Sequence, residues 1–284
     1  MLLGAFAALS CVIGVAVCFL SGAFGTASWM WMLPVTVLGC LLAMIGLMFG
    51  FLMYLCKRVD QDVPQEEDDK LYRVVTNLVI QSVLPILRIH VKMSGLEKMP
   101  KEGRFLLIAN HTDNSDPIIL LYCLAKYQLA FISKRENRDM FVIGPMMHRL
   151  QCQLINREND REALKTILKC IQILKEDKAS VAVFPEGGID DDLLLHKFKP
   201  GVFKIAQKAN VPIVVCTLKN TKQIFRNLRK LKKTDVELHL VDVIPAEELK
   251  GKNTVEIGEM VYEMMIADMG EAFRYIQPEN NEST

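Results

Sequence analysis

Two polar side chains in the stretch ANHTDNSDP (109–117) have the chemical types and the spacing of a general base and its partner. Histidine changes its charge near neutral pH, so His111 is suited to removing a proton from a hydroxyl group. A carboxylate on the other ring nitrogen fixes the tautomer and stabilises the imidazolium, and Asp116 is close enough in sequence to supply it. The alternative interpretation is structural. Asp113, Asn114 and Asp116 then form a turn and a helix cap, and His111 is an ordinary polar residue of that loop.

Two other chemistries find little support in this loop. Ser115 lies within it, but a serine nucleophile on a strand-to-helix elbow is expected in a GxSxG sequence, which the chain lacks. His111, Asp113 and Asp116 have metal-binding side chains, but no pair of ligands follows downstream. We therefore predict no metal site.

Further polar residues follow other apolar runs. In FPEGG (184–188), Gly187 lets the backbone approach a ligand closely and Glu186 is suited to accept hydrogen bonds from a polyol hydroxyl. Lys134 and Arg157 each follow a short apolar run, and their charges are suited to binding a phosphate. The alternative is that all of these are ordinary loop and surface residues.

A strongly basic segment lies later in the chain. Residues 219–233 read KNTKQIFRNLRKLKK, with Ile224, Phe225, Leu228 and Leu231 on one helical face and cations around it. This pattern is typical of a helix lying on an anionic membrane surface. It is equally typical of an amphipathic surface helix of a globular domain.

The elements that must position these residues alternate between strand-like and helix-like stretches. We expect strands at 89–93, 105–109, 129–133, 153–156, 181–184, 213–217 and 236–241. We expect helices at 71–87, 118–125, 160–174, 202–208, 221–231 and 255–272. This alternation predicts an α/β domain with a mainly parallel or mixed sheet flanked by helices.

The start of the chain has a different character, because its first 56 residues contain no Asp, Glu, Lys or Arg. Apolar stretches at 2–24 and 30–56 each reach the length that a membrane-spanning helix needs. We predict a transmembrane hairpin rather than a pair of buried core helices, with small-residue packing through Gly46 and Gly50 or through Gly39 and Ala43. Positive charges directly after the hairpin predict that the remaining chain lies in the cytoplasm, where the eight cysteines stay reduced.

These patterns divide the chain into four parts. Residues 1–58 form the transmembrane helical hairpin, and residues 59–88 form an acidic linker with an amphipathic or interfacial helix. Residues 89–277 form the catalytic domain, and residues 278–284 form a disordered tail.

Four sequence blocks in order resemble the glycerolipid acyltransferase family. NHTDNSD matches its HxxxxD motif, and GPMMHRLQCQLINR (144–157) is similar to its second block, which ends in arginine. FPEGG matches the third block, and KPGVFKIAQKANVPIVVC (199–216) is similar to the run that ends in the fourth. The resemblance covers about residues 89–243 and is closest to the bacterial membrane-anchored 1-acylglycerol-3-phosphate acyltransferases.

The resemblance implies a glycerol-3-phosphate acyltransferase-like fold and a cofactor-free acyl transfer from acyl-CoA or acyl-carrier protein to a lysolipid hydroxyl. His111 is then the base and Asp116 its partner, with no acyl-enzyme. The acceptor site is expected to comprise Lys134, Arg157, Glu186, Gly187 and Pro212, the cations holding its phosphate. The partners implied are the lysolipid acceptor, the acyl donor and membrane lipids, with no nucleic acid, at the cytoplasmic face of the cell membrane.

One departure affects the acceptor. After FPEG the family usually has threonine and then a basic or hydroxyl residue, whereas this chain has Gly188 and Ile189 followed by three aspartates. Like charges near a phosphate are unfavourable. Either the acidic run (Asp190, Asp191 and Asp192) points into solvent, or the acceptor is not lysophosphatidic acid but glycerol 3-phosphate or another lysolipid. A thioester hydrolase and a catalytically silent membrane scaffold are further alternatives.

Overall fold

The computed structural model of the protein describes residues 2–65 and 67–276, so the expected tail at 278–284 lies outside the described residues. Its centre is a seven-stranded sheet in the order β1-β7-β6-β2-β5-β3-β4. Neighbouring strands are parallel except for the antiparallel pair β6 and β7. All seven expected strands are confirmed: β1 (Ile89–Ser94), β2 (Leu106–Ala109), β3 (Leu129–Lys134), β4 (Gln153–Ile155), β5 (Ser180–Val183), β6 (Ile213–Lys219) and β7 (Thr234–Ile244).

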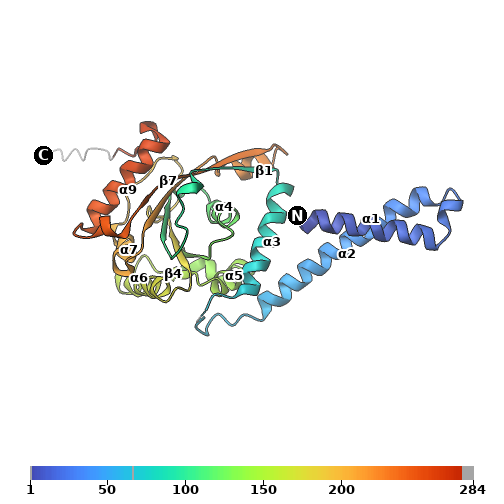
Figure 1. Ribbon diagram of the computed structural model, residues 1–284, viewed down its shortest axis with the longest axis horizontal. Coiled ribbons are helices and arrows are strands. Elements are labelled where there is room, and N and C mark those ends of the chain that lie inside the picture. Colours follow the sequence, from blue (N-terminus) through green and yellow to red (C-terminus); the bar gives the residue numbers. More distant parts are fainter. Residues whose placement is uncertain (1, 66, 277–284) are drawn as a thin grey trace.

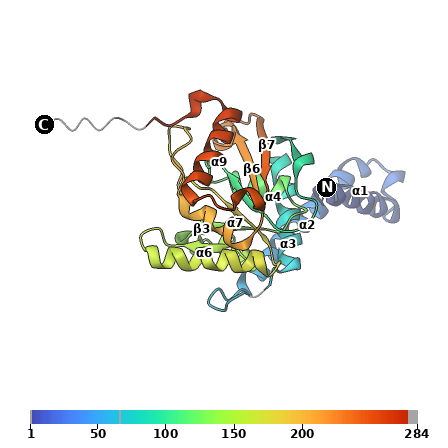
Figure 2. The same cartoon turned by 60° about the vertical axis from the view of Figure 1, so that its left-hand side comes forward.

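Helices cover both faces of the sheet, as expected for an α/β domain. Figures 1 and 2 show α6 (Asp160–Lys175), α7 (Lys204–Ala209) and α9 (Thr254–Met269) on the side of the domain away from the N-terminal hairpin. The other face carries α3 (Lys70–Ile86), α4 (Asp116–Cys123) and α8 (Gln223–Leu228), whose buried side chains share one core. Helix α5 (Ile143–Arg149) lies near the start of α3 (Figure 1). The mixed sheet with its two helical layers is the fold predicted from the sequence.

Strand β2 lies at the middle of the sheet and is buried along its whole length. Because side chains alternate between the two faces of a strand, Leu106 and Ile108 join the core under α6, α7 and α9. Leu107 and Ala109 join the second core, under α3 and α4. The loop that follows β2 therefore starts at the buried centre of the domain.

The N-terminal hairpin extends away from the domain (Figure 1) and consists of α1 (Leu2–Leu20) and α2 (Trp29–Lys57). Both helices are long and apolar enough to cross a membrane. With 29 residues, α2 is about 43 Å long and exceeds the roughly 30 Å hydrocarbon core of a bilayer. Its last turns extend to the domain, where Leu55 and Cys56 pack against Tyr72 and Met146.

The contact between α1 and α2 uses different small residues from those expected. Ser10, Gly14 and Cys18, one turn apart on α1, are buried. A Cβ added at Gly14 would lie 2.7 Å from the side chain of Val37 on α2. Nothing lies within 4 Å of such an atom at Gly39, Gly46 or Gly50. The predicted small-residue packing through α2 is therefore wrong, because those glycines face away from α1.

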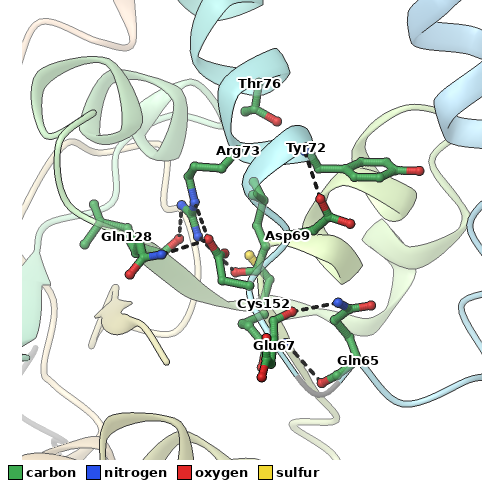
Figure 3. Close-up of polar contacts among 12 residues, drawn as sticks. Gln65, Glu67, Asp69, Tyr72, Arg73, Thr76, Gln128 and Cys152 are labelled. Carbon is green, nitrogen blue, oxygen red and sulfur yellow. Dashed lines mark hydrogen bonds and ion pairs between the residues drawn. The ribbon is translucent and has the colours of Figure 1, made fainter. Parts of the chain in front are cut away.

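The acidic linker is fixed to the domain by a buried ion pair. Arg73 on α3 pairs with Asp68, and only 8% and 4% of their side chains are exposed. Arg73 also donates to the carbonyl oxygen of Leu129 at the start of β3 (2.8 Å), and Gln128 donates to Asp68 (3.3 Å). Figure 3 shows Arg73 and Gln128 meeting at this point. The start of α3 is thus joined to the start of β3.

The linker also binds α5 and the turn before it. Arg149 Nη1 donates to Gln65 Oε1 (2.8 Å) and lies 3.9 Å from an Asp69 oxygen, and the Asp69 N–H donates to the Arg149 carbonyl (3.1 Å). Arg138 pairs with Asp62. These contacts connect the end of α2 to the domain through folded chain rather than through a loose tether.

Candidate active site

The loop after β2 brings His111 and Asp116 into contact. His111 Nδ1 lies 2.9 Å from Asp116 Oδ2, and Asp116 is fully buried at the first position of α4. A carboxylate oxygen only accepts, so the Nδ1–H donates and Nε2 retains its lone pair. The ring nitrogen that is free to take a proton is therefore Nε2.

The Asp116 carboxylate also organises the backbone of its own loop. Oδ2 accepts hydrogen bonds from the N–H groups of Thr112 (2.7 Å) and Asp113 (2.9 Å), in addition to the bond from His111. Asp113 accepts from the N–H and the hydroxyl of Ser115. The turn formed by Asp113 and the histidine–carboxylate pair, which the sequence presents as alternatives, are thus both present in one loop, whereas Ser115 at the N-cap of α4 makes no side-chain capping hydrogen bond.

The position of the imidazole is fixed by stacking as well as by hydrogen bonding. The His111 ring lies on the ring of Phe184, with centroids 4.1 Å apart and planes 15° apart. Phe184 in turn lies beside Phe131 of β3. Sequence reasoning did not assign Phe184 this role, although the residue belongs to the FPEGG block.

Glu186 holds the histidine loop from the neighbouring strand β5. Its Oε1 accepts from the His111 N–H (2.7 Å) and its Oε2 from the His196 N–H (3.1 Å). Burial raises the pKa of Glu186 to about 7, and the two backbone N–H groups oppose that rise only in part. Both oxygens thus already accept from the protein, so the structure adds a positioning role to the expected contact with an acceptor hydroxyl. Gly187 follows at φ 79°, with the Lys199 side chain against it.

Two polar contacts join the histidine loop to β6. Asn110, which is buried, exchanges hydrogen bonds with the backbone of Leu218 (2.9 and 2.7 Å) and extends the pairing of β2 with β6. Thr112 and Thr221 share a hydroxyl–hydroxyl hydrogen bond of 2.8 Å. No spacing rule in the sequence indicates either contact, because the residues are more than a hundred positions apart.

The expected phosphate-binding cations lie along the same edge of the sheet. Lys134 ends β3 and Arg157 follows β4, and both strands run parallel to β5 on the side of β2 away from β6. Both side chains are exposed, and neither forms an ion pair with another described residue. Two cations without an ion-pair partner among the described residues thus lie at the carboxyl ends of β3, the neighbour of β5, and of β4, the next strand along.

Pro212 lies elsewhere, and the expectation for it needs correction. Its carbonyl accepts from the Leu106 N–H at the amino end of β2 (3.0 Å), whereas His111 follows the carboxyl end of that strand. Four strand residues span about 13 Å. Pro212 lies directly before β6, at the opposite end of the strands from His111, and this placement does not support the expected contact with the acceptor.

The acidic run points outward. Asp191 is fully exposed, and Lys222 Nζ binds the Asp191 carbonyl (2.8 Å) and carboxylate (3.2 Å). The His196 ring binds both carboxylate oxygens of Asp192 at 3.0 Å, and the side chain of Asp190 is largely exposed, 3.6 Å from His196. The negative charges are therefore paired at the surface rather than directed at His111, so they do not argue against a phosphate-bearing ligand.

Comparison with known proteins places this geometry in context. The profile of the acyltransferase family matches residues 90–219, a range that contains His111, Asp116 and Glu186. A probable 1-acyl-sn-glycerol-3-phosphate acyltransferase of Mycoplasma pneumoniae is 32% identical over 178 residues, which is 61% of this chain and 64% of that protein. The 1-acyl-sn-glycerol-3-phosphate acyltransferase of Borreliella burgdorferi is 26% identical over 66% of this chain and 76% of its own length.

The fold also has a counterpart among solved structures. The crystal structure of the 1-acyl-sn-glycerophosphate (LPA) acyltransferase PlsC from Thermotoga maritima aligns with a TM-score of 0.58 and 21% identity. The alignment covers 80% of this chain and 90% of that one. At this identity the likeness concerns the fold.

Proposed function

We propose that the chain is an O-acyltransferase that converts lysophosphatidic acid to phosphatidic acid, because residues 90–219 match the acyltransferase family. The acyl group comes from acyl-CoA or acyl-carrier protein, and no cofactor takes part. The observation that carries the proposal is the His111–Asp116 pair at 2.9 Å, on a loop held by Glu186 and by the Phe184 ring.

The geometry supports direct transfer. His111 Nε2 removes the proton from the acceptor hydroxyl, whose oxygen attacks the thioester carbonyl and forms a tetrahedral intermediate. When the carbon–sulfur bond breaks, the imidazolium returns its proton to the thiolate that leaves. Asp116 stabilises the imidazolium between these two transfers. General base catalysis supplies about 10²–10⁴-fold, and positioning of the two substrates supplies much of the remainder.

The acceptor's phosphate is held by Lys134 and Arg157 at the ends of β3 and β4. The family position usually occupied by a basic or hydroxyl residue is Ile189 here, so the cations of the neighbouring strands carry more of the phosphate's charge. The Lys199 side chain packs against Gly187 in the Glu186 loop. Arginine suits this task because its planar group binds phosphate through two hydrogen bonds.

The membrane hairpin gives the enzyme access to its lipid substrates. The apolar helices α1 and α2 associate the chain with a membrane, and the positive charges of Lys57 and Arg58 at the end of α2 support a cytoplasmic position for the catalytic domain. The lysolipid and the product both partition into the bilayer, so the acceptor enters from the leaflet rather than from water.

A panel assay tests the proposal. Purified full-length protein in lipid vesicles is given acyl-CoA or acyl-carrier protein with lysophosphatidic acid, glycerol 3-phosphate or a lysolipid without phosphate, and the products are separated. We expect phosphatidic acid as the main product and a loss of at least a hundredfold in kcat for His111→Ala. The matched control His90→Ala, at an exposed position of β1, keeps its activity.

Three results would contradict the proposal. Equal turnover by the His111→Ala variant rejects the base. Free fatty acid as the only product indicates a hydrolase. Acylation confined to glycerol 3-phosphate or to a lysolipid without phosphate rejects the acceptor.

A further inference from the structure

Residues 219–234 concentrate positive charge to an extent unlike the rest of the chain. They contain seven Lys or Arg residues and no Asp or Glu, although the whole chain has a net charge of only +1. Three of these cations have an acidic partner, since Lys219 pairs with Asp268, Lys222 with Asp191 and Lys233 with Asp235. Among the described residues, no ion pair involves the other four, Arg226, Arg229, Lys230 and Lys232. We call residues 225–233 the basic segment.

The basic segment presents apolar side chains among its unpaired cations. Leu231 is 76% exposed and Phe225 is 53% exposed, whereas Ile224, one residue earlier, is buried in the core under α3 and α4. Helix α8 is therefore anchored by Ile224 and exposes Phe225, and the turn that follows α8 exposes Leu231. Water is a poor environment for both side chains.

The backbone around Leu231 is held firmly in an unfavourable conformation. Leu231 has φ 52°, in the left-handed region that non-glycine residues rarely adopt. Arg88 Nη1 donates to the Leu231 carbonyl (2.7 Å), and the Lys232 N–H donates to the Asn227 carbonyl (2.9 Å). These hydrogen bonds keep Leu231 at the outer tip of the turn instead of letting it fold back onto the domain.

The position of the basic segment links it to the membrane hairpin. Arg88 directly follows α3, which lies between the domain and the hairpin (Figure 1). Ile86, at the end of α3, is also largely exposed. Further along the same helix, Leu71, Val74 and Leu78 are exposed at one-turn spacing. Exposed apolar side chains thus lie toward both ends of α3, on the side where α2 enters the domain and on the side where the basic segment lies, with the buried Ser82 between them.

We propose that the basic segment is a second membrane contact, which binds the anionic headgroups of the leaflet that the hairpin enters. Arg226, Arg229, Lys230 and Lys232 bind phosphate oxygens of acidic lipids, and Leu231 inserts below the headgroups. A bilayer fits better than an acidic protein because apolar side chains stand among the cations and because exposed apolar side chains lie toward both ends of α3. With contacts at both ends of α3, the domain has one fixed orientation on the membrane. The proposal rests on membrane association and not on the acyl-transfer reaction.

Fluorescence quenching by brominated lipids tests the contact directly. The full chain, with its two tryptophans changed by Trp29→Phe and Trp31→Phe, receives Leu231→Trp and is reconstituted in lipid nanodiscs. The matched control receives Leu168→Trp instead, at a position that is 56% exposed on α6, on the side of the domain away from the hairpin. Discs rich in brominated phosphatidylglycerol are compared with discs of brominated phosphatidylcholine alone.

We expect strong quenching of Leu231→Trp in the anionic discs, weaker quenching in the neutral discs and none above background for Leu168→Trp. Each Lys or Arg near an anionic surface contributes about 1 kcal/mol, which is roughly fivefold in binding. Changing Arg226, Arg229, Lys230 and Lys232 to glutamine therefore removes the difference between the two kinds of disc. High salt weakens the quenching in the same direction.

Two results overturn the proposal. Quenching of Leu231→Trp no stronger than that of Leu168→Trp in anionic discs shows that the segment does not touch the bilayer. Unchanged quenching in the four-glutamine variant, combined with loss of activity on acyl-carrier protein but not on acyl-CoA, shows that the cations serve an acidic protein instead. Neither readout of lipid contact requires the enzyme to turn over, so failure here is separate from failure of the proposed reaction.

Discussion

Asp116 accepts three hydrogen bonds on Oδ2, while its buried Oδ1 has no partner among the described residues. In Asp116→Asn the amide oxygen takes the place of Oδ2, so the loop keeps its shape while its negative charge is lost. The imidazolium is then less stable during transfer. We expect kcat to fall by about 10²–10⁴-fold with little change in the KM for lysophosphatidic acid. Steady-state kinetics measure this, and an unchanged melting temperature shows that the fold is intact. A kcat near that of the wild type would mean that Asp116 has only a structural role.

Glu186 gives the fold a specific dependence on pH. Burial raises its pKa from 4.5 to about 7, so the folded protein binds a proton that the unfolded chain has already lost between these values. Its contribution to stability is complete below about pH 4.5 and is lost as the pH rises through about 7, a change of about 3 kcal/mol. The amide side chain in Glu186→Gln does not titrate, so the variant lacks this dependence of stability on pH.

Thermal unfolding in detergent across this pH range measures the effect. We expect the wild type to lose stability relative to Glu186→Gln as the pH rises from about 4.5 to 7. In the variant, the glutamine amide directs an N–H toward the backbone N–H of His111 or His196. This mismatch lowers the unfolding free energy of the variant by an amount that does not depend on pH. The informative quantity is therefore how the difference in stability between the wild type and Glu186→Gln changes with pH. Parallel curves would show that Glu186 does not titrate in this range.

For individual residues, the sequence predicts contacts within one loop far better than contacts between residues that follow different strands. His111 and Asp116 belong to one turn, so their spacing contains most of the geometry. Glu186 lies 75 residues from His111, and its hydrogen bond exists only because β5 is the neighbour of β2 in the sheet. Stacking on Phe184 has the same origin. Pro212 shows the opposite error, because it belongs to the fourth sequence block but precedes β6, at the end of that strand away from His111.

Helix α3 depends on the ion pair of Arg73 with Asp68, which is almost wholly buried. Arg73→Met leaves the Asp68 carboxylate buried, with hydrogen bonding from Gln128 only. Breaking one partner of a buried pair costs about 3–5 kcal/mol. We expect denaturant unfolding to show a loss of this size for Arg73→Met.

The double variant Arg73→Met, Asp68→Leu separates the two contributions. Replacing both charges removes the unpaired carboxylate, so we expect it to recover much of the lost stability. A double variant as unstable as Arg73→Met alone would show that the hydrogen bond to the Leu129 carbonyl, rather than the charge, is what holds α3.

Elements with clear periodicity were predictable, and short ones with mixed signals were not. The strands are apolar runs bounded by loop residues, which explains why all seven were found. Helix α5 was missed because Gly144 and Pro145 are typical of a turn, although Pro is tolerated in the first turn of a helix. The expected helix at 221–231 is shorter in the structure because the chain leaves α8 at Leu228 and turns through the left-handed Leu231.

The whole molecule relies on the folded linker between the hairpin and the catalytic domain. Arg138 and Arg149 bind the linker through Asp62, Gln65 and Asp69. Changing both arginines to glutamine removes these side-chain contacts while the Arg73–Asp68 pair remains, so the linker loosens and the domain holds its orientation toward the membrane less firmly. We expect a severalfold loss of activity on lysophosphatidic acid in vesicles, but unchanged activity on a short-chain, water-soluble analogue.

The same pair of assays includes its own control. Arg161→Gln removes an exposed arginine from the start of α6, away from the linker, and is expected to leave both activities unchanged. Equal losses on the bilayer substrate and on the soluble analogue would place the defect in the catalytic centre rather than in the orientation of the domain.

The pairing of β1 with β7 has a consequence for how the protein is made. Ile89 lies opposite Thr234, so the first strand of the domain must wait until 145 further residues have left the ribosome. At about 5–20 residues per second, this delay is on the order of ten seconds. During that time the hairpin is already complete while the edge of β1 has no partner. Folding of the domain therefore has to finish after membrane insertion, and a chain that stops before β7 exposes a free strand edge to chaperones and proteases.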